Sequence, residues 1–239
     1  MTIYDLFLES GPKRRKTMVH VLALLGCVAV GPTTDAALAA TPEAIRAYER
    51  FLRRHGDDVD PEAAIATRVA EHITEGYFLG NGSPNIVFGP DLAPLTGAEM
   101  TRMVRRFAGM SEELATWAAT QTDAALAAIP PAGGRPAREV LRHVLAARGS
   151  YLAASLGGSQ GLHRIATAAE RGEIALPAAF AESTERLIAI VAAATPEQRA
   201  NPRQISSGPK TFRQALRRLL EHEWEHLAEL SRRPGGPAI

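Results

Sequence analysis

The sequence contains a single cysteine, Cys27, among its 239 residues. One cysteine excludes an internal disulfide and a cysteine-rich zinc site. Basic and acidic residues nearly balance, for a formal net charge of +1, and Lys13, Lys16 and Lys210 are the only lysines. So small a charge gives no reason to expect a nucleic-acid partner. The sequence also lacks a Gly-x-Gly-x-x-Gly motif after a strand and a phosphate-binding loop, so nothing indicates a nucleotide site.

The longest apolar run near the N-terminus covers residues 18–30 and is too short to cross a membrane. Because basic residues precede it, the run has the outline of a signal peptide, and export is one interpretation. The alternation of residues 3–8 and 17–22 around Gly11 and Pro12 instead indicates a β-hairpin. We therefore expect a cytoplasmic protein without membrane contact.

Capping and periodicity predict the remaining elements. Residues 1–55 are expected to form a three-stranded antiparallel sheet and one helix, separate from the later helices, with Thr33 or Thr34 as helix cap and Pro42 as a break. Residues 56–95 read as a connecting segment with a helix at 63–74 and a buried strand at 86–88. Residues 96–239 show a capping box at Thr96 and four amphipathic helices, near 96–129, 136–155, 177–194 and 212–232, which predicts a four-helix bundle. A loop or short helix with His163 is expected after the second helix, and Thr211 is expected to cap the fourth.

The last of these helices carries the motif Leu-Leu-Glu-His-Glu-Trp-Glu-His-Leu. Its two histidines, His222 and His226, are four residues apart and therefore lie on one face of a helix, where both imidazoles can bind one metal ion. Glu223 occupies a position of the apolar stripe, which predicts a buried carboxylate. By the same helical phase, Glu221, Glu225 and Glu229 are expected to be solvated.

The segment 96–239 resembles the DinB/YfiT-like superfamily, which includes mycothiol-dependent isomerases and bacterial thiol S-transferases. The resemblance lies in Arg-Glu-Val-Leu-Arg-His-Val on the second helix and His-Glu-Trp-Glu-His-Leu on the last. It implies that His143 joins His222 and His226 in binding a divalent metal. His20, His55, His72 and His163 are not expected to take part.

Residues 1–55 resemble the HicB-like antitoxin domain, in which three strands are followed by Gly-x-Thr and a helix. Matching residues include Gly26, Cys27, Gly31 and Thr33. The resemblance implies a small αβ module without nuclease residues. It also keeps open a non-catalytic alternative, in which this module binds a protein partner and the metal site is structural or vestigial.

Three imidazoles with an open position are typical of a catalytic metal site. Zinc is the expected ion, with nickel, iron or manganese as alternatives. Such an ion activates water or holds a thiolate, so we expect a transferase, isomerase or hydrolase acting on a small molecule, with a low-molecular-weight thiol as co-substrate. Glu223 is placed to orient a ligand imidazole or to act as the general base.

The expected pocket lies where the three histidines meet, lined by the first and third helices, with Arg142 or Arg148 at its rim. A homodimer is compatible with this assignment.

His-Glu-x-x-His also occurs in zinc proteases, but no histidine follows it as a third ligand. The remaining alternative is that the histidines are ordinary core residues.

Overall fold

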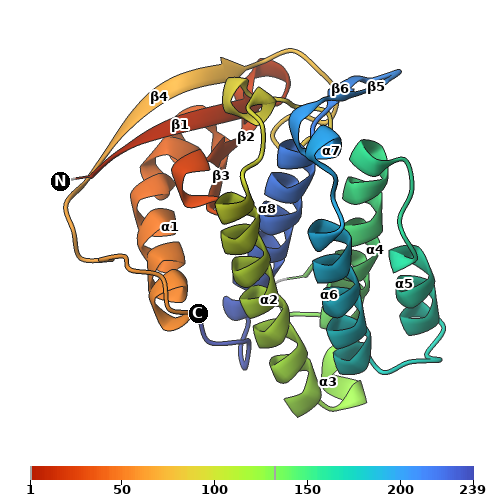
Figure 1. Cartoon of the computed structure of the whole chain (residues 1–239). Coiled ribbons are helices and arrows are strands. Elements are labelled where there is room, and N and C mark those ends of the chain that lie inside the picture. Colours follow the sequence, from red (N-terminus) through yellow and green to blue (C-terminus); the bar gives the residue numbers. More distant parts are fainter. Residues whose placement is uncertain (1, 132) are drawn as a thin grey trace.

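The chain folds into a small sheet with one helix, followed by a larger helical region (Figure 1). The structure is a computed structural model that describes residues 2–131 and 133–239. The first part consists of β1 (Thr2–Ser10), η1 (Pro12–Arg14), β2 (Arg15–His20), η2 (Leu22–Leu24), β3 (Val28–Thr33), α1 (Thr34–Arg54) and β4 (Ile65–Ile73). After the short turn η3 (Gly89–Leu92), the second part consists of α2 (Gly97–Thr120), α3 (Asp123–Ala127), α4 (Ala137–Leu156), α5 (Leu162–Glu170), α6 (Leu176–Ala192), α7 (Pro196–Ala200), β5 (Arg203–Ile205), β6 (Gly208–Lys210) and α8 (Phe212–Ser231).

The N-terminal sheet has four strands in the order β3-β2-β1-β4. β1–β2 and β2–β3 are antiparallel pairs, whereas β4 runs parallel to β1. The helix predicted at residues 63–74 is wrong, because this segment forms β4. Its alternating β-branched residues Ile65, Thr67 and Val69 pair with β1 in a strand register.

Helix α1 begins where Thr33 caps it, since the Thr33 hydroxyl accepts a hydrogen bond from the backbone N–H of Ala36 at 3.2 Å. The helix then runs without interruption past Pro42, which was expected to break it. Apolar residues on both sides of the proline, among them Ala37 and Ile45, are fully buried. Their burial against the sheet stabilises the helix across the missing N–H donor.

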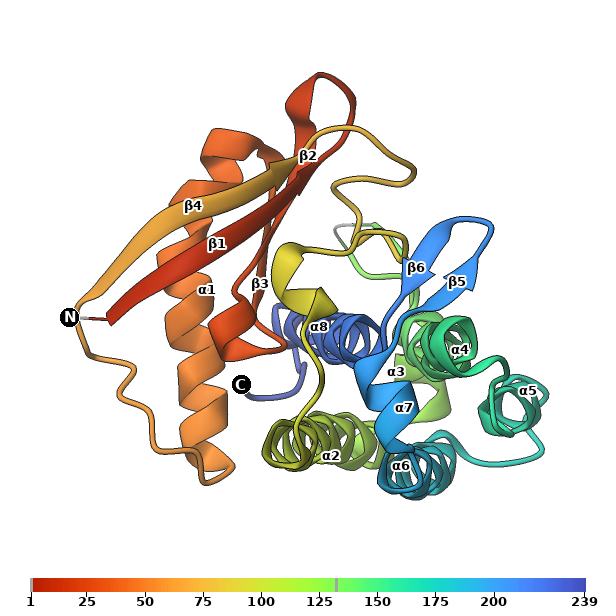
Figure 2. The same cartoon turned by 45° about the horizontal axis from the view of Figure 1, so that its top comes forward.

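The helical region contains four long helices, α2, α4, α6 and α8, which Figure 2 shows nearly end-on. α8 packs against α2 and α4, and α2 also packs against α6. The predicted caps are present: Thr96 forms a capping box with Glu99, and Thr211 caps α8. α5 occupies the stretch expected to be a loop or short helix and lies outside α4 and α6 (Figure 2).

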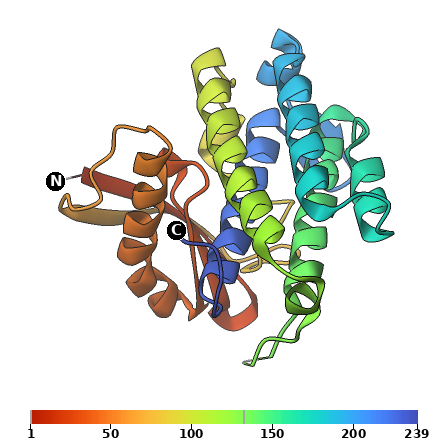
Figure 3. The ribbon, with the colours of Figure 1, turned by 90° about the horizontal axis from the view of Figure 1, so that it is seen from below.

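One hydrophobic core extends through both parts of the chain. The indole of Trp224 on α8 lies edge-on against Tyr48, with ring centroids 4.8 Å apart, and tilted against Phe51 at 5.4 Å. Figure 3 shows α8 between α1 and the other long helices. The expectation that residues 1–55 are separate from the helices is therefore wrong: they share one core with α8.

The segment between β4 and α2 covers the other face of the sheet near the end of β1. Phe7, Leu79, Ile86 and Phe88 form a second, small apolar cluster there, with the rings of Phe7 and Phe88 5.5 Å apart. Residues 86–88 are buried in part but are not a strand. The apolar run at residues 18–30 forms parts of β2 and β3, and no helix among the described residues has the length and apolar character to span a membrane.

Candidate metal centre

Helix α8 presents two imidazoles one turn apart. His222 and His226 are each 6% exposed, and their ring centroids are 4.5 Å apart. The Thr211 hydroxyl accepts the backbone N–H of Gln214 at 2.9 Å and fixes where the helix begins. The i, i+4 spacing of the histidines then places both rings on the side of α8 that faces α4.

Helix α4 contributes the third imidazole. The Nε2 atom of His143 lies 3.0 Å from the Nε2 atom of His222, and the rings of His143 and His226 are 5.0 Å apart. One ligand atom from each of the three histidines lies within 4.8 Å of the others. Nitrogens bound to one tetrahedral zinc at 2.0–2.1 Å are roughly 3.4 Å apart, so small side-chain rotations suffice to place all three around an ion.

The other four histidines are engaged elsewhere. His20 bonds to Glu221, His55 to Glu113, His72 to Ser10 and His163 to Ser150. The structure thus brings together the three histidines that the sequence suggested as ligands and places the remaining four in other environments.

Two of the clustered imidazoles are held neutral. Burial lowers the pKa of His222 well below its ordinary value of 6.5, and the neighbouring His226 adds to the shift. Burial and His226 likewise lower the pKa of His143 to about 4, because its ring lies against the other two although the residue as a whole is exposed. Metal binding requires neutral imidazole, so these two side chains need not lose a proton at neutral pH to bind an ion.

A carboxylate orients the third imidazole. The Nδ1–H of His226 donates to Glu229 Oε2 at 2.8 Å, and Arg233 Nη2 donates to Glu229 Oε1 at 2.5 Å. The hydrogen bond from His226 is the main cause that lowers the pKa of Glu229 to about 2. Because Nδ1 carries the proton, Nε2 of His226 is left with its lone pair available to a metal. The expectation that Glu229 is merely solvated is therefore wrong.

We expect Glu229→Gln to weaken the binding of zinc by roughly tenfold to a hundredfold, the usual effect of losing the outer hydrogen-bond partner of a ligand histidine. The amide keeps the shape of the side chain but loses the charge that holds Nδ1–H in place. Competition with a chromophoric chelator measures the affinity. Glu225→Gln, on the same helix but without a hydrogen bond to a ligand, is the matched control, and equal affinities of the two variants would contradict the orienting role.

The three imidazoles open onto a pocket of about 810 Å³. Its walls come from α4, α8, the β5–β6 hairpin and residues 77–85, which we call the wall segment. The wall segment contributes Tyr77, Phe78, Asn81, Gly82, Pro84 and Asn85. The prediction that the first and third helices line the pocket is wrong. Arg135 lines it, whereas Arg142 lines a neighbouring hollow of about 480 Å³ on the other side of His143.

The segment that carries the three histidines matches a known protein family. A family model described as the DinB superfamily matches residues 101–230, which is more than half of the chain. The chain belongs to the DinB superfamily. Comparisons with curated proteins and with solved structures gave no match. The DinB match includes all three histidines but neither the N-terminal sheet nor the wall segment, so the HicB-like resemblance of residues 1–55 stays a prediction.

Glu223, the predicted general base, is buried in this DinB-superfamily chain but does not serve the imidazoles. Its two carboxylate oxygens accept hydrogen bonds from Arg148 on α4, at 2.7 and 3.1 Å. Arg148 has no exposed surface and lies between the rings of Phe107 and Phe180, its Cζ atom 4.7 Å from each centroid. Both oxygens of Glu223 are thus engaged with the guanidinium, and the hydrogen bonds of Glu223 among the described residues include none to an imidazole. The rim position predicted for Arg148 is therefore wrong, and the catalytic role of Glu223 stays a prediction.

The neighbouring carboxylate, Glu221, was expected to be solvated and is instead 1% exposed. It accepts hydrogen bonds from His20 Nδ1 on β2 at 2.8 Å, and from Arg217 and Arg218 on its own helix. Burial acts against ionisation here, but the neighbouring cations outweigh it and hold the pKa of Glu221 below its ordinary value. This buried ionic cluster joins the N-terminal sheet to α8 one residue before His222.

The wall segment is fixed by the same sheet. Glu9 of β1, which is fully buried, accepts the backbone N–H groups of Gly82 at 2.6 Å and Ser83 at 2.9 Å. Gly82 has a φ of +74°, and a Cβ atom at this position would collide with the guanidinium of Arg218. The left-handed φ and the close approach of Gly82 to the Arg218 side chain of α8 both favour glycine at this position. The N-terminal sheet therefore positions one side of the DinB pocket.

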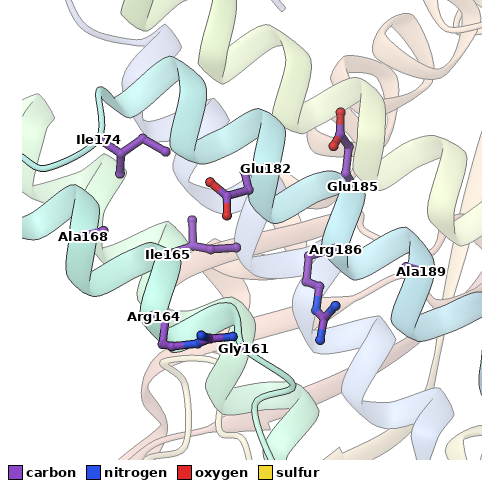
Figure 4. Close-up of a pocket in the computed structure, with 9 residues that line it drawn as sticks. All are labelled: Gly161, Arg164, Ile165, Ala168, Ile174, Glu182, Glu185, Arg186 and Ala189. Carbon is purple, nitrogen blue, oxygen red and sulfur yellow. The ribbon is translucent and has the colours of Figure 1, made fainter.

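Another hollow, of about 560 Å³, lies between α5 and α6 (Figure 4). Two arginines, Arg164 and Arg186, and two carboxylates, Glu182 and Glu185, line it without any histidine. Its mixed charge and its distance from the imidazoles set it apart from the metal site.

Proposed function

We propose that the chain is a metal-dependent enzyme that acts on a small molecule through a divalent ion held by His143, His222 and His226. The observation that carries the proposal is the juxtaposition of three imidazoles with an open pocket of about 810 Å³. Neutral imidazoles suit zinc, nickel, iron and manganese, and the nitrogen-only set favours zinc. We read α2, α4, α6 and α8 as the four-helix bundle that carries the site.

The donor set fits a divalent ion without rearrangement of the backbone. The nitrogens are close together, the proton of His226 is held on Nδ1 by Glu229, and all three histidines line the pocket. An ion bound there would act as a Lewis acid toward a thiol or water in the pocket. Arg135, which lines the same pocket, supplies positive charge near the imidazoles and favours an anionic substrate or co-substrate.

A thiol-dependent transferase or isomerase is the first candidate reaction, and hydrolysis the second. Both need a site that a small molecule reaches directly, and the pocket provides one. The wall segment places two aromatic rings at the pocket, since Tyr77 is 74% and Phe78 52% exposed and their rings stack with centroids 5.9 Å apart. Such rings offer an apolar surface to the body of the substrate.

The non-catalytic alternative places a protein partner on the N-terminal sheet. Ile3 on β1 and Val69 on β4 are exposed there, 59% and 46%. The open pocket beside the imidazoles favours the enzyme, because a binding module has no need of an accessible metal position. The homodimer and the cytoplasmic location remain predictions.

Metal analysis of protein purified without a histidine tag tests the proposal. We expect about one equivalent of a divalent ion per chain, as one three-histidine site requires. The cobalt-substituted protein is then titrated with low-molecular-weight thiols, which should change the visible spectrum of the ion as sulfur enters its coordination sphere. Metal content far below one equivalent after incubation with zinc would disprove the site. A cobalt spectrum unchanged by thiols would exclude the transferase reaction and leave hydrolysis.

A further inference from the structure

Lys210, the last residue of β6, is a buried cation without a carboxylate partner. It is 2% exposed. Its ammonium donates to the backbone carbonyl of Pro84 at 2.8 Å and to the side-chain oxygen of Asn85 at 3.0 Å. Both acceptors are neutral, and no ion pair among residues 2–131 and 133–239 includes Lys210.

This arrangement leaves the charge of the lysine uncompensated. An ammonium has three N–H donors, and neutral acceptors take two of them. A buried charge is costly unless an opposite charge accompanies it. Burial accordingly lowers the pKa of Lys210 from its ordinary value. An anion beside the ammonium would supply the missing charge and the third acceptor.

The lysine lies on the pocket that opens onto the imidazoles. Lys210, Pro84 and Asn85 all line that pocket together with His222 and His226. Lys210 precedes His222 by twelve positions, ten of them within α8, and at 1.5 Å per residue the helix alone accounts for roughly 15 Å of separation. Tyr151 and Ala154 of α4 line the pocket between them.

Other charges near the pocket do not replace this partner. Glu225 is the one carboxylate among the residues that line it. Glu225 follows Lys210 by fifteen positions, thirteen of them within α8, so the helix alone separates them by roughly 20 Å. Arg135, at the imidazole side, is a second cation.

We propose that Lys210 is an anion-binding subsite, so that the substrate is an elongated small molecule with a carboxylate or phosphate group at the end far from the atom it presents to the three histidines. The inference rests on the proposed function, since it assigns the second end of the same pocket. The ammonium binds the anionic group, and Pro84 and Asn85 hold the ammonium in place. The distance between Lys210 and the imidazoles selects the length of the substrate.

The first experiment uses the metal-free protein, with carbon-13 at the ε position of lysine. The chain has only three lysines, so three signals are expected, and that of Lys210 is assigned by its loss in Lys210→Gln. Hexanoate and hexyl phosphate should shift the Lys210 signal saturably, whereas hexanamide should not. Lys13 and Lys16 report the general effect of salt. The stronger of the two anions identifies the group as carboxylate or phosphate.

The second experiment uses the cobalt-loaded protein and mercaptocarboxylates of increasing length, each paired with its amide. At one chain length the acid should bind roughly tenfold or more tightly than the amide, the usual difference for a hydrogen bond to a charged group. Lys210→Gln, which keeps donors toward Pro84 and Asn85 without the charge, should remove this preference. Lys13→Gln is the matched control and should retain it.

The outcomes separate the two proposals. A Lys210 signal that neither anion moves, in protein that binds cobalt, would overturn the anion subsite and leave the proposed function. Failure to bind cobalt would overturn the proposed function, while the first experiment would still decide the subsite. If Lys210→Gln only lowers Tm and the acid binds no better than the amide in the parent protein, the lysine is a structural clamp. If Lys210→Gln does not fold, the Lys210 signal is assigned by elimination from Lys13→Gln and Lys16→Gln, and the measurements on the parent protein remain decisive.

Discussion

Replacing His222 with glutamine should weaken zinc binding by more than about a hundredfold. Loss of a residue that only hydrogen-bonds to a ligand histidine costs up to about a hundredfold, and loss of the ligand itself should cost more. His222 is a direct ligand in the proposed site, it is buried, and its Nε2 atom lies 3.0 Å from that of His143. Glutamine keeps a polar side chain of similar size but removes the imidazole. Competition with a chelating dye measures the change in affinity.

A second readout comes from stability. Zinc at a hundred times its Kd should raise the free energy of unfolding of the parent protein by about 2.7 kcal/mol. The same zinc concentration should leave the Tm of His222→Gln almost unchanged. His163→Gln, on α5 and outside the cluster, is the control and should respond to zinc as the parent does. Zinc-dependent stabilisation of His222→Gln equal to that of the parent would rule out the three-histidine site.

Replacing Glu223 with glutamine should lower the free energy of unfolding by about 3–5 kcal/mol, the usual cost of removing one partner of a buried ion pair. The variant leaves the guanidinium of Arg148, which has no exposed surface, without its carboxylate. For a chain of this size the loss corresponds to a fall in Tm of roughly 10 °C. Zinc affinity of the folded variant should be unchanged, because Glu223 contacts no imidazole.

The double variant Arg148→Met, Glu223→Leu supplies the control for this prediction. It removes both charges and should recover most of the stability, or exceed it, because apolar residues of similar volume then fill the site. Phe107 and Phe180, which now face the guanidinium, would enclose the methionine. Strictly additive effects of the two single changes would show that the residues do not act as a pair.

The sequence predicted the long helices well because local signals define them. Thr96 and Thr211 cap their helices as expected, and the apolar stripes face the core. The fold of residues 63–74 was not predictable in the same way. These residues carry both a helical and an alternating pattern, and only pairing with β1, some sixty residues earlier, selects the strand.

The structure brings the three predicted histidines together, whereas the solvated positions predicted for Glu221 and Glu229 were wrong. Helical phase identifies which residues share a face, but it does not identify what each face meets. Glu221 lies opposite the stripe that packs on the other helices, so it reads as solvated, yet that side of α8 packs against the sheet. Glu229 could have been found from its i, i+3 spacing to His226 and i, i+4 spacing to Arg233.

Glu9 holds the wall segment through the backbone N–H groups of Gly82 and Ser83, so this contact does not depend on the side chains of the segment during evolution. The imidazoles come from α4 and α8, whereas one side of the cavity beside them comes from a stretch that precedes residue 101. Since Glu9 binds main-chain atoms of Gly82 and Ser83, substitutions at Tyr77, Phe78 or Asn85 leave these hydrogen bonds in place. Substitutions at these positions can therefore change which small molecules the pocket binds, while the three histidines stay the same. A library of variants confined to these wall positions would test new ligands without altering the histidine cluster.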